Sequence, residues 1–158
     1  MRVQDYIVAE TKSAAEEIWK YAKAVGDDKV AWSPLDAGRS VLDIARECAQ
    51  CPIWGVMLIT TRSMPEFTEE SQAAMKAEMD KLTTVDQCVD LCNENLAKLY
   101  EVVANLTDEQ LKEEMFLPFS GGRNYTISEI AEYPHWNFDY HQGQIAYIQT
   151  LYGDKEMY

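Results

Sequence analysis

The chain has 158 residues, 47% of them hydrophobic, and a formal net charge of −13 at pH 7. This length and composition suit a single folded domain over residues 1–158 and argue against disorder. No apolar run is long enough for a membrane span or a signal peptide, and the negative charge disfavours nucleic acid and anionic membranes as partners.

Apolar residues in steps of three and four predict helices over most of the chain. The first helix covers residues 3–25. A turn-rich linker over residues 32–38 leads to a second helix, which starts at Gly38 or Ser40. Pro52 ends or kinks that helix because proline lacks a backbone N–H, and we expect helical structure to continue beyond it.

A third helix is predicted over residues 68–106, with Thr68 as its N-cap. Its apolar positions form a heptad-like seam, which is typical of a long helix packed along a bundle. The seam consists of Leu82, Val85, Val89, Cys92, Leu96, Leu99, Val103 and Leu106.

Two capping boxes define the remaining elements. One box, at Thr107, starts a short extra helix, and residues 118–125 then form a loop or a small hairpin. The other, at Thr126, starts the final helix, which Gly153 ends. The sequence therefore predicts an all-α protein with four main helices around one core.

The four cysteines allow two interpretations. Cys48 and Cys51 form a CxxC pair, and Cys88 and Cys92 lie one turn apart on a predicted helix. Together they could make a four-thiolate zinc site or a redox site, but such pairs usually lie on tight turns or at a helix start after a strand. Thiols that only pack are the favoured interpretation, and reduced thiols favour the cytoplasm.

His141 is the most informative candidate for function because it interrupts an apolar stripe. A titratable ring on a buried stripe needs a hydrogen-bond partner or a metal. Asn137 and Gln144 share its helix face, whereas His135 is turned about 120° away and is expected at the surface or rim. The stripe consists of Ile127, Ile130, Pro134, Phe138, His141, Ile145, Ile148 and Leu151.

The motif His141-Gln-Gly-Gln144, followed by Leu-Tyr-Gly-Asp, resembles the signature of the DinB/YfiT-like four-helix-bundle family. The phrase Trp32-Ser-Pro and the segment from Arg39 to Glu47 are similar to that family's second-helix motif. The resemblance covers nearly the whole chain. It implies an up-down-down-up bundle, with a short extra helix and a loop before the last helix, that is often a homodimer.

The resemblance also implies a divalent metal held by three histidines, one on the second helix and two on the last. This chain departs from that triad, because Glu47 and Asn137 stand at two of the positions and only His141 remains. Glu47, Asn137 and His141 could still hold zinc, nickel or manganese, although an amide is a weak ligand for zinc or nickel. Alternatively the metal is lost, and His141 donates to Glu47 in a buried polar cluster.

Two functions follow from these alternatives. The first is a metal-dependent enzyme of the thiol transferase or hydrolase class, acting on a small-molecule thiol or another small ligand. The second is a non-catalytic dimeric bundle that binds a small ligand or a protein. The sequence identifies no nucleophile or general base.

Overall fold

The computed structural model describes residues 1–35 and 37–158, apart from the side chain of Ser120. Asp36, within the predicted linker, therefore lies outside the described residues. Within the described part of the chain, no helix is both long and apolar enough to cross a membrane.

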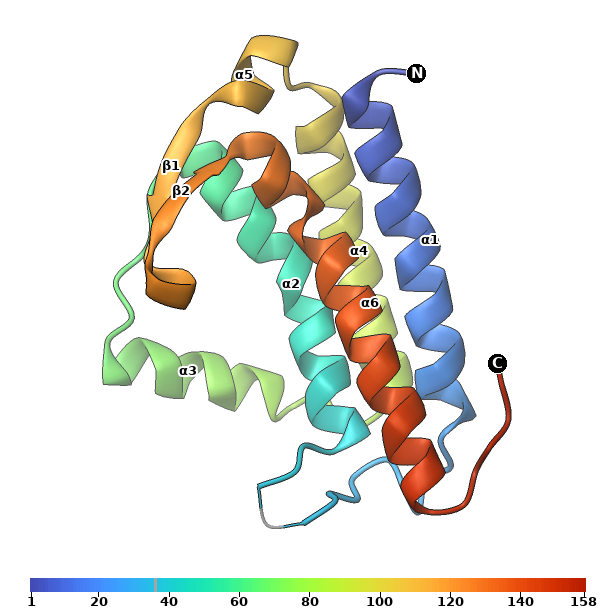
Figure 1. Cartoon of the computed structure of the whole chain (residues 1–158). Helices are drawn as coiled ribbons and strands as arrows, with labels where there is room; N and C mark the ends of the chain where they lie inside the picture. The colour runs from blue at the N-terminus through green and yellow to red at the C-terminus, as the bar shows by residue number, and fades with distance from the viewer. Residues whose placement is uncertain (36) are drawn as a thin grey trace.

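Four long helices form one bundle: α1 (Val3–Ala24), α2 (Val41–Thr61), α4 (Val85–Ala104) and α6 (Ile127–Leu151). In Figure 1, α1 and α6 run downward while α2 and α4 run upward, which is the predicted up-down-down-up order. Helix α2 packs against both α4 and α6, and α1 packs against the same two helices. The predicted fold class is therefore confirmed.

Side-chain caps fix where the helices begin. Ser40 caps α2 through a capping box, and α6 starts with the predicted box of Thr126 and Glu129. Thr107 caps the short helix α5 (Asp108–Lys112) in the same way. In each box the hydroxyl accepts from the backbone N–H three residues further on, which has no partner within the helix.

The single helix predicted over residues 68–106 is wrong, because the segment forms α3 (Glu69–Met79) and α4 with a turn between them. Thr84 caps α4, and the Gln87 Oε1 atom accepts from the backbone N–H groups of Thr83 and Thr84 at 2.7 and 3.2 Å. These bonds to a side chain replace the backbone bonds that a continuous helix would need.

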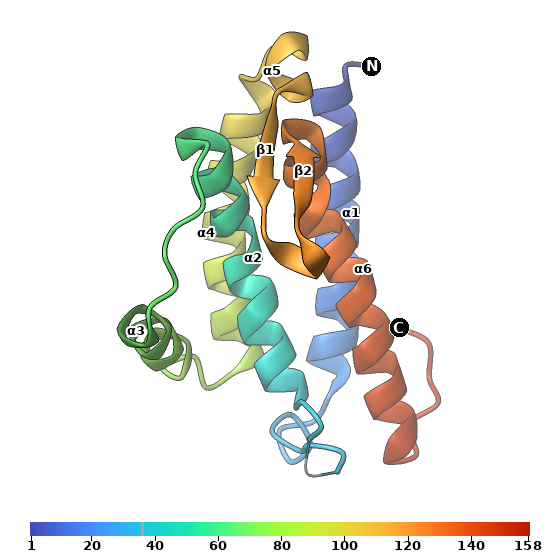
Figure 2. The same ribbon diagram turned by 60° about the vertical axis from the view of Figure 1, so that its left-hand side comes forward.

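Helix α3 lies outside the bundle and forms part of the connection between α2 and α4 (Figures 1 and 2). None of its residues, all of which are described, is buried. Tertiary packing therefore does not hold α3 in line with α4, and the local caps decide where the helix breaks.

A small hairpin precedes the last helix, so the second of the two predicted forms of residues 118–125 is confirmed. Strand β1 (Glu114–Leu117) pairs antiparallel with β2 (Arg123–Thr126). The connection includes a 3-10 turn and Gly122, whose φ of +77° favours glycine. Figure 2 shows the hairpin in front of α2 and α6.

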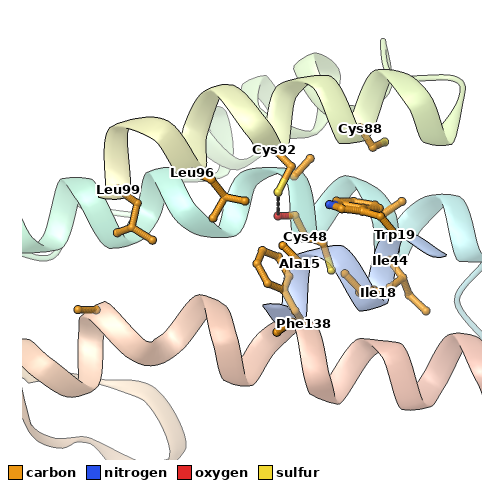
Figure 3. Close-up of a cluster of buried hydrophobic side chains, with 14 of the residues drawn as sticks. Ala15, Ile18, Trp19, Ile44, Cys48, Cys88, Cys92, Leu96, Leu99 and Phe138 are labelled. Atoms are coloured by element: carbon orange, nitrogen blue, oxygen red, sulfur yellow. Dashed lines mark hydrogen bonds between the residues drawn. The ribbon is translucent and has the colours of Figure 1, made fainter. Parts of the chain in front are cut away.

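The buried core contains all four cysteines. One of them, Cys92 of α4, reaches the backbone carbonyl of Cys48 in α2 (Figure 3). Pro52 has no N–H to bond the carbonyl of Cys48, and the Cys92 thiol donates to that oxygen at 3.6 Å. The next carbonyl, that of Ala49, accepts from Asn95 Nδ2 at 2.9 Å. Helix α4 therefore supplies a donor for the carbonyl that the proline leaves free, and α2 continues past Pro52 as expected.

The thiols belong to the packing of the bundle. In the described part of the chain all four are free, and burial raises the pKa of Cys88 to about 11 and that of Cys92 to about 12. No group of three or more metal-binding His, Cys, Asp or Glu side chains occurs among the described residues. High thiol pKa values suit inert core residues rather than nucleophiles.

Candidate functional site

The apolar stripe predicted on the last helix faces the core and carries His141 with it. Every member of the stripe is buried except Leu151, near the end of the helix. The His141 side chain is 3% exposed. A ring this deep needs partners for its two nitrogen atoms.

Helices α2 and α6 bring the three predicted residues together. His141 Nε2 lies 2.9 Å from Glu47 Oε1, and Asn137 Nδ2 donates to the same oxygen at 3.3 Å. Glu47 is in the second turn of α2, whereas Asn137 and His141 lie one turn apart near the middle of α6. Their meeting confirms the predicted facing pair of Glu47 and His141.

The cluster is less enclosed than the sequence suggested, because the Glu47 side chain is 44% exposed. Its second oxygen, Oε2, lies 2.7 Å from Nη1 of Arg39. The other guanidinium nitrogen of Arg39, Nη2, donates to the backbone carbonyl of Asp43 at 3.1 Å. Glu47 therefore joins a buried imidazole to a half-exposed guanidinium.

Sequence reasoning assigned no role to Arg39. Arg39 precedes the Ser40 cap and so lies outside α2. Helical periodicity therefore cannot predict which way its side chain points. The only available signal was a long cationic side chain two helical turns before a carboxylate.

The electrostatics of the cluster favour an ionised Glu47. The hydrogen bond from His141 is the largest influence; burial opposes it and the Arg39 charge supports it, and together they lower the pKa of Glu47 to about 2. At neutral pH Glu47 therefore presents a full negative charge between α2 and α6.

Gln144 holds the far side of the imidazole. Its Oε1 atom lies 2.7 Å from His141 Nδ1, so a proton on Nδ1 has an acceptor. This contact orients the ring with Nε2 toward Glu47. Gln144 thus plays the part of the outer partner that a metal-binding histidine ordinarily has.

An exposed row of aromatic rings runs along α6 beside the cluster. The centroids of Tyr133 and Trp136 lie 5.5 Å apart, and Trp136 stacks on Tyr140 at 5.3 Å. Tyr140 in turn meets the edge of His141 at 5.2 Å. All three rings are about half-exposed, and Tyr147 extends the row with 65% exposure.

His135 lies apart from the cluster, as helix geometry predicted. Its Nε2 atom is 3.2 Å from Asp139 Oδ2, one turn further along α6, and its side chain is 32% exposed. Among the described residues, it contributes nothing to the group around Glu47.

No protein-family model matches the chain, and no curated protein matches its sequence. Solved structures do match. A DinB-like protein from Bacillus subtilis aligns with a TM-score of 0.64 at 14% identity, over 97% of this chain and 96% of that one. YfiT from the same organism, described as a probable metal-dependent hydrolase with an unusual four-helix bundle topology, aligns with a TM-score of 0.75 at 15% identity, over 95% and 87%.

A mycothiol-dependent maleylpyruvate isomerase aligns with a TM-score of 0.66 at 14% identity, over 92% of this chain but only 61% of that one. At these identities the likeness concerns the fold. The chain has the DinB/YfiT-like four-helix-bundle fold.

Proposed function

We propose that this chain is a divalent-cation-dependent enzyme of the thiol transferase or hydrolase class, in which Glu47, Asn137 and His141 hold the ion. The fold it shares with a probable metal-dependent hydrolase and a mycothiol-dependent isomerase supports the class. The observation that carries the proposal is the convergence of three potential ligands from two helices on one point.

The spacing of Glu47 and His141 suits a small cation. Two ligands at right angles on an octahedral ion, with bonds of about 2.1 Å, lie about 3 Å apart. The atoms that meet Glu47 Oε1 are His141 Nε2 at 2.9 Å and Asn137 Nδ2 at 3.3 Å. The separation of Glu47 Oε1 and His141 Nε2 therefore also suits two neighbouring ligands of one ion. Asn137 becomes a third ligand once its amide turns over, so that Oδ1 replaces the Nδ2 donor that faces Glu47.

The Asn137 amide supplies a further argument. Its Oδ1 atom is buried and has no hydrogen-bond partner among the described residues. An unsatisfied buried acceptor ordinarily costs about 1–3 kcal/mol of stability. Because Nδ2 is the atom that faces Glu47, a cation between Glu47 and His141 would give Oδ1 a partner once the amide turns over.

The types of donor indicate which ion fits. Glu47 and Asn137 offer oxygen atoms, and His141 offers one nitrogen. Carboxylate and amide oxygens suit manganese, whereas zinc and nickel favour sites richer in imidazole or thiolate. Manganese is therefore our first choice, ahead of zinc and nickel.

The surrounding residues have definite tasks in this proposal. A bound divalent ion supplies Lewis acidity, which lowers the pKa of a water or thiol beside it. Gln144 holds the imidazole in place, and Glu47 supplies the negative charge that attracts a cation. The rings of Tyr133, Trp136 and Tyr140 offer an apolar surface for a small substrate beside the site.

The ion pair between Arg39 and Glu47 favours a second function. A guanidinium at 2.7 Å already neutralises the carboxylate, so the cluster is electrically satisfied without a metal. In that case the chain is a non-catalytic bundle, homodimeric through its exposed aromatic row, that binds a small ligand or a protein.

Calorimetric titration of untagged, chelator-treated protein with manganese separates the two functions. The metal-dependent function predicts saturable binding of one ion per chain, which Glu47→Gln and His141→Ala each abolish. Glu113→Gln is the matched control, because Glu113 also pairs with an arginine, Arg62, at 2.6 Å but lies elsewhere. No binding by the parent chain, or equal binding by all variants, would favour the non-catalytic bundle.

The reaction class needs a second assay. The manganese-loaded parent chain is given an activated ester in one reaction, and a low-molecular-weight thiol with an electrophilic acceptor in another. We expect manganese-dependent turnover of one of them and its loss in His141→Ala. Turnover that is the same with and without manganese would contradict the metal-dependent mechanism.

A further inference from the structure

The linker before α2 delivers a permanent positive charge to the cluster. Arg39 Nη1 lies 2.7 Å from Glu47 Oε2, and Arg39 Nη2 donates to the carbonyl of Asp43 at 3.1 Å. Two contacts therefore hold the guanidinium against the first turns of α2.

Different groups approach the two carboxylate oxygens of Glu47. His141 and Asn137 approach Oε1, and Arg39 approaches Oε2 of the same carboxylate. A divalent ion bound at Oε1 would be separated from the Arg39 guanidinium only by the Glu47 carboxylate. Two positive charges this close repel each other. An ion can bind tightly only if Arg39 loosens its hold on Glu47.

We propose that Arg39 is a built-in competitor of the divalent cation and sets the affinity of the site. It neutralises Glu47 when no ion is bound and weakens the binding of an ion when one is present. The inference rests on the proposed function only in placing the ion between Glu47 and His141. Both Arg39 and Glu47 are more than two-fifths exposed, so the guanidinium can move into solvent.

A purely structural role for Arg39 makes a different prediction. If the side chain only fastens the linker to α2, removing its charge lowers stability and leaves ion affinity unchanged. Arg39→Lys keeps the charge with altered hydrogen bonding, whereas Arg39→Gln and Arg39→Met remove the charge and either keep or lose polarity. Together the three variants separate the effect of the Arg39 charge on ion affinity from the effect of its hydrogen bonds on stability.

The test is titration with manganese chloride, followed by calorimetry, of the whole chain and these variants. Arg39→Gln and Arg39→Met should bind manganese on the order of tenfold more tightly than the parent chain, from the Coulomb repulsion that is lost. Arg39→Lys should stay close to the parent. Arg62→Gln is the matched control and should change nothing, because Arg62 pairs with Glu113 away from the cluster.

The outcomes separate the two proposals. Equal binding by the parent and both neutral variants overturns the role of Arg39 and leaves the metal site standing. Binding by the neutral variants alone supports the competition but contradicts a metal-loaded parent chain. If no chain binds manganese, both proposals fail, and melting curves of the variants confirm that each was folded.

Discussion

Replacing His141 with alanine tests the cluster without any assumption about metal. The change removes the ring nitrogen that lies 2.9 Å from Glu47 Oε1. It also leaves a cavity in place of an imidazole ring that is 3% exposed. Truncating a well-buried side chain costs about 2 kcal/mol at the lower end of the usual range. The lost hydrogen bond to a charged group adds about 1 kcal/mol, since Glu47 is half-exposed and keeps Arg39.

A double-mutant cycle isolates the second contribution. Urea unfolding at pH 7 of the parent chain, His141→Ala, Glu47→Gln and the double variant should give a coupling energy of about 1 kcal/mol. The sequence alone suggested a fully buried carboxylate, whose isolation would cost about 3 kcal/mol or more. The exposure of Glu47 and its contact with Arg39 lower that figure. A coupling energy within error of zero would refute the pairing.

The pH dependence of stability gives an independent reading of the same pair. The pKa of Glu47 is lowered from 4.5 to about 2 in the folded chain, mainly by the His141 hydrogen bond. A lowered carboxyl pKa stabilises the fold above the unfolded value, and the stabilisation is lost as pH falls from 4.5 toward 2. After allowance for solvent screening we expect about 1–2 kcal/mol. The stability advantage of the parent over Glu47→Gln should shrink across this window, and a constant difference would contradict the assignment.

Three further results are expected. Glu47→His together with Asn137→His should raise nickel and zinc affinity above that of the parent in calorimetric titration, because two imidazoles join the third; unchanged affinity would mean that the helices do not present them to one ion. Sedimentation at micromolar concentration should give a dimer mass, and Trp136→Ala with Tyr140→Ala should give a monomer, whereas a monomeric parent would count against the exposed row as an interface. Thr126→Ala should lower the free energy of unfolding by about 1 kcal/mol because it removes the α6 cap, and an unchanged urea midpoint would dispute that role.

The helix boundaries show what local sequence signals can decide. Capping boxes at Thr107 and Thr126 start α5 and α6 where the sequence placed them. Hydrophobic periodicity failed between α3 and α4, since the seam residue Leu82 lies in the intervening turn. There the side-chain hydrogen bonds around Thr84 start a separate helix, α4, although the heptad-like repeat of apolar residues continues through this segment.

The candidate site divides along similar lines. His141 could be found because one polar ring on an apolar stripe is visible from spacing alone, and the family resemblance supplied Glu47 and Asn137. Arg39 could not be found, because its contact joins a linker to a helix and depends on the path of the chain before Ser40. The half-exposure of Glu47 was also out of reach, since it depends on how α2 and α6 pack.

The central claim is that Glu47, Asn137 and His141 hold a divalent cation, and diffraction from a crystal of the whole chain soaked in manganese tests it most directly. We predict an anomalous peak within bonding distance of Glu47 Oε1 and His141 Nε2, with Arg39 displaced from its contact with Glu47. A crystal that shows no peak there and keeps the Nη1 to Oε2 contact near 2.7 Å would contradict the claim.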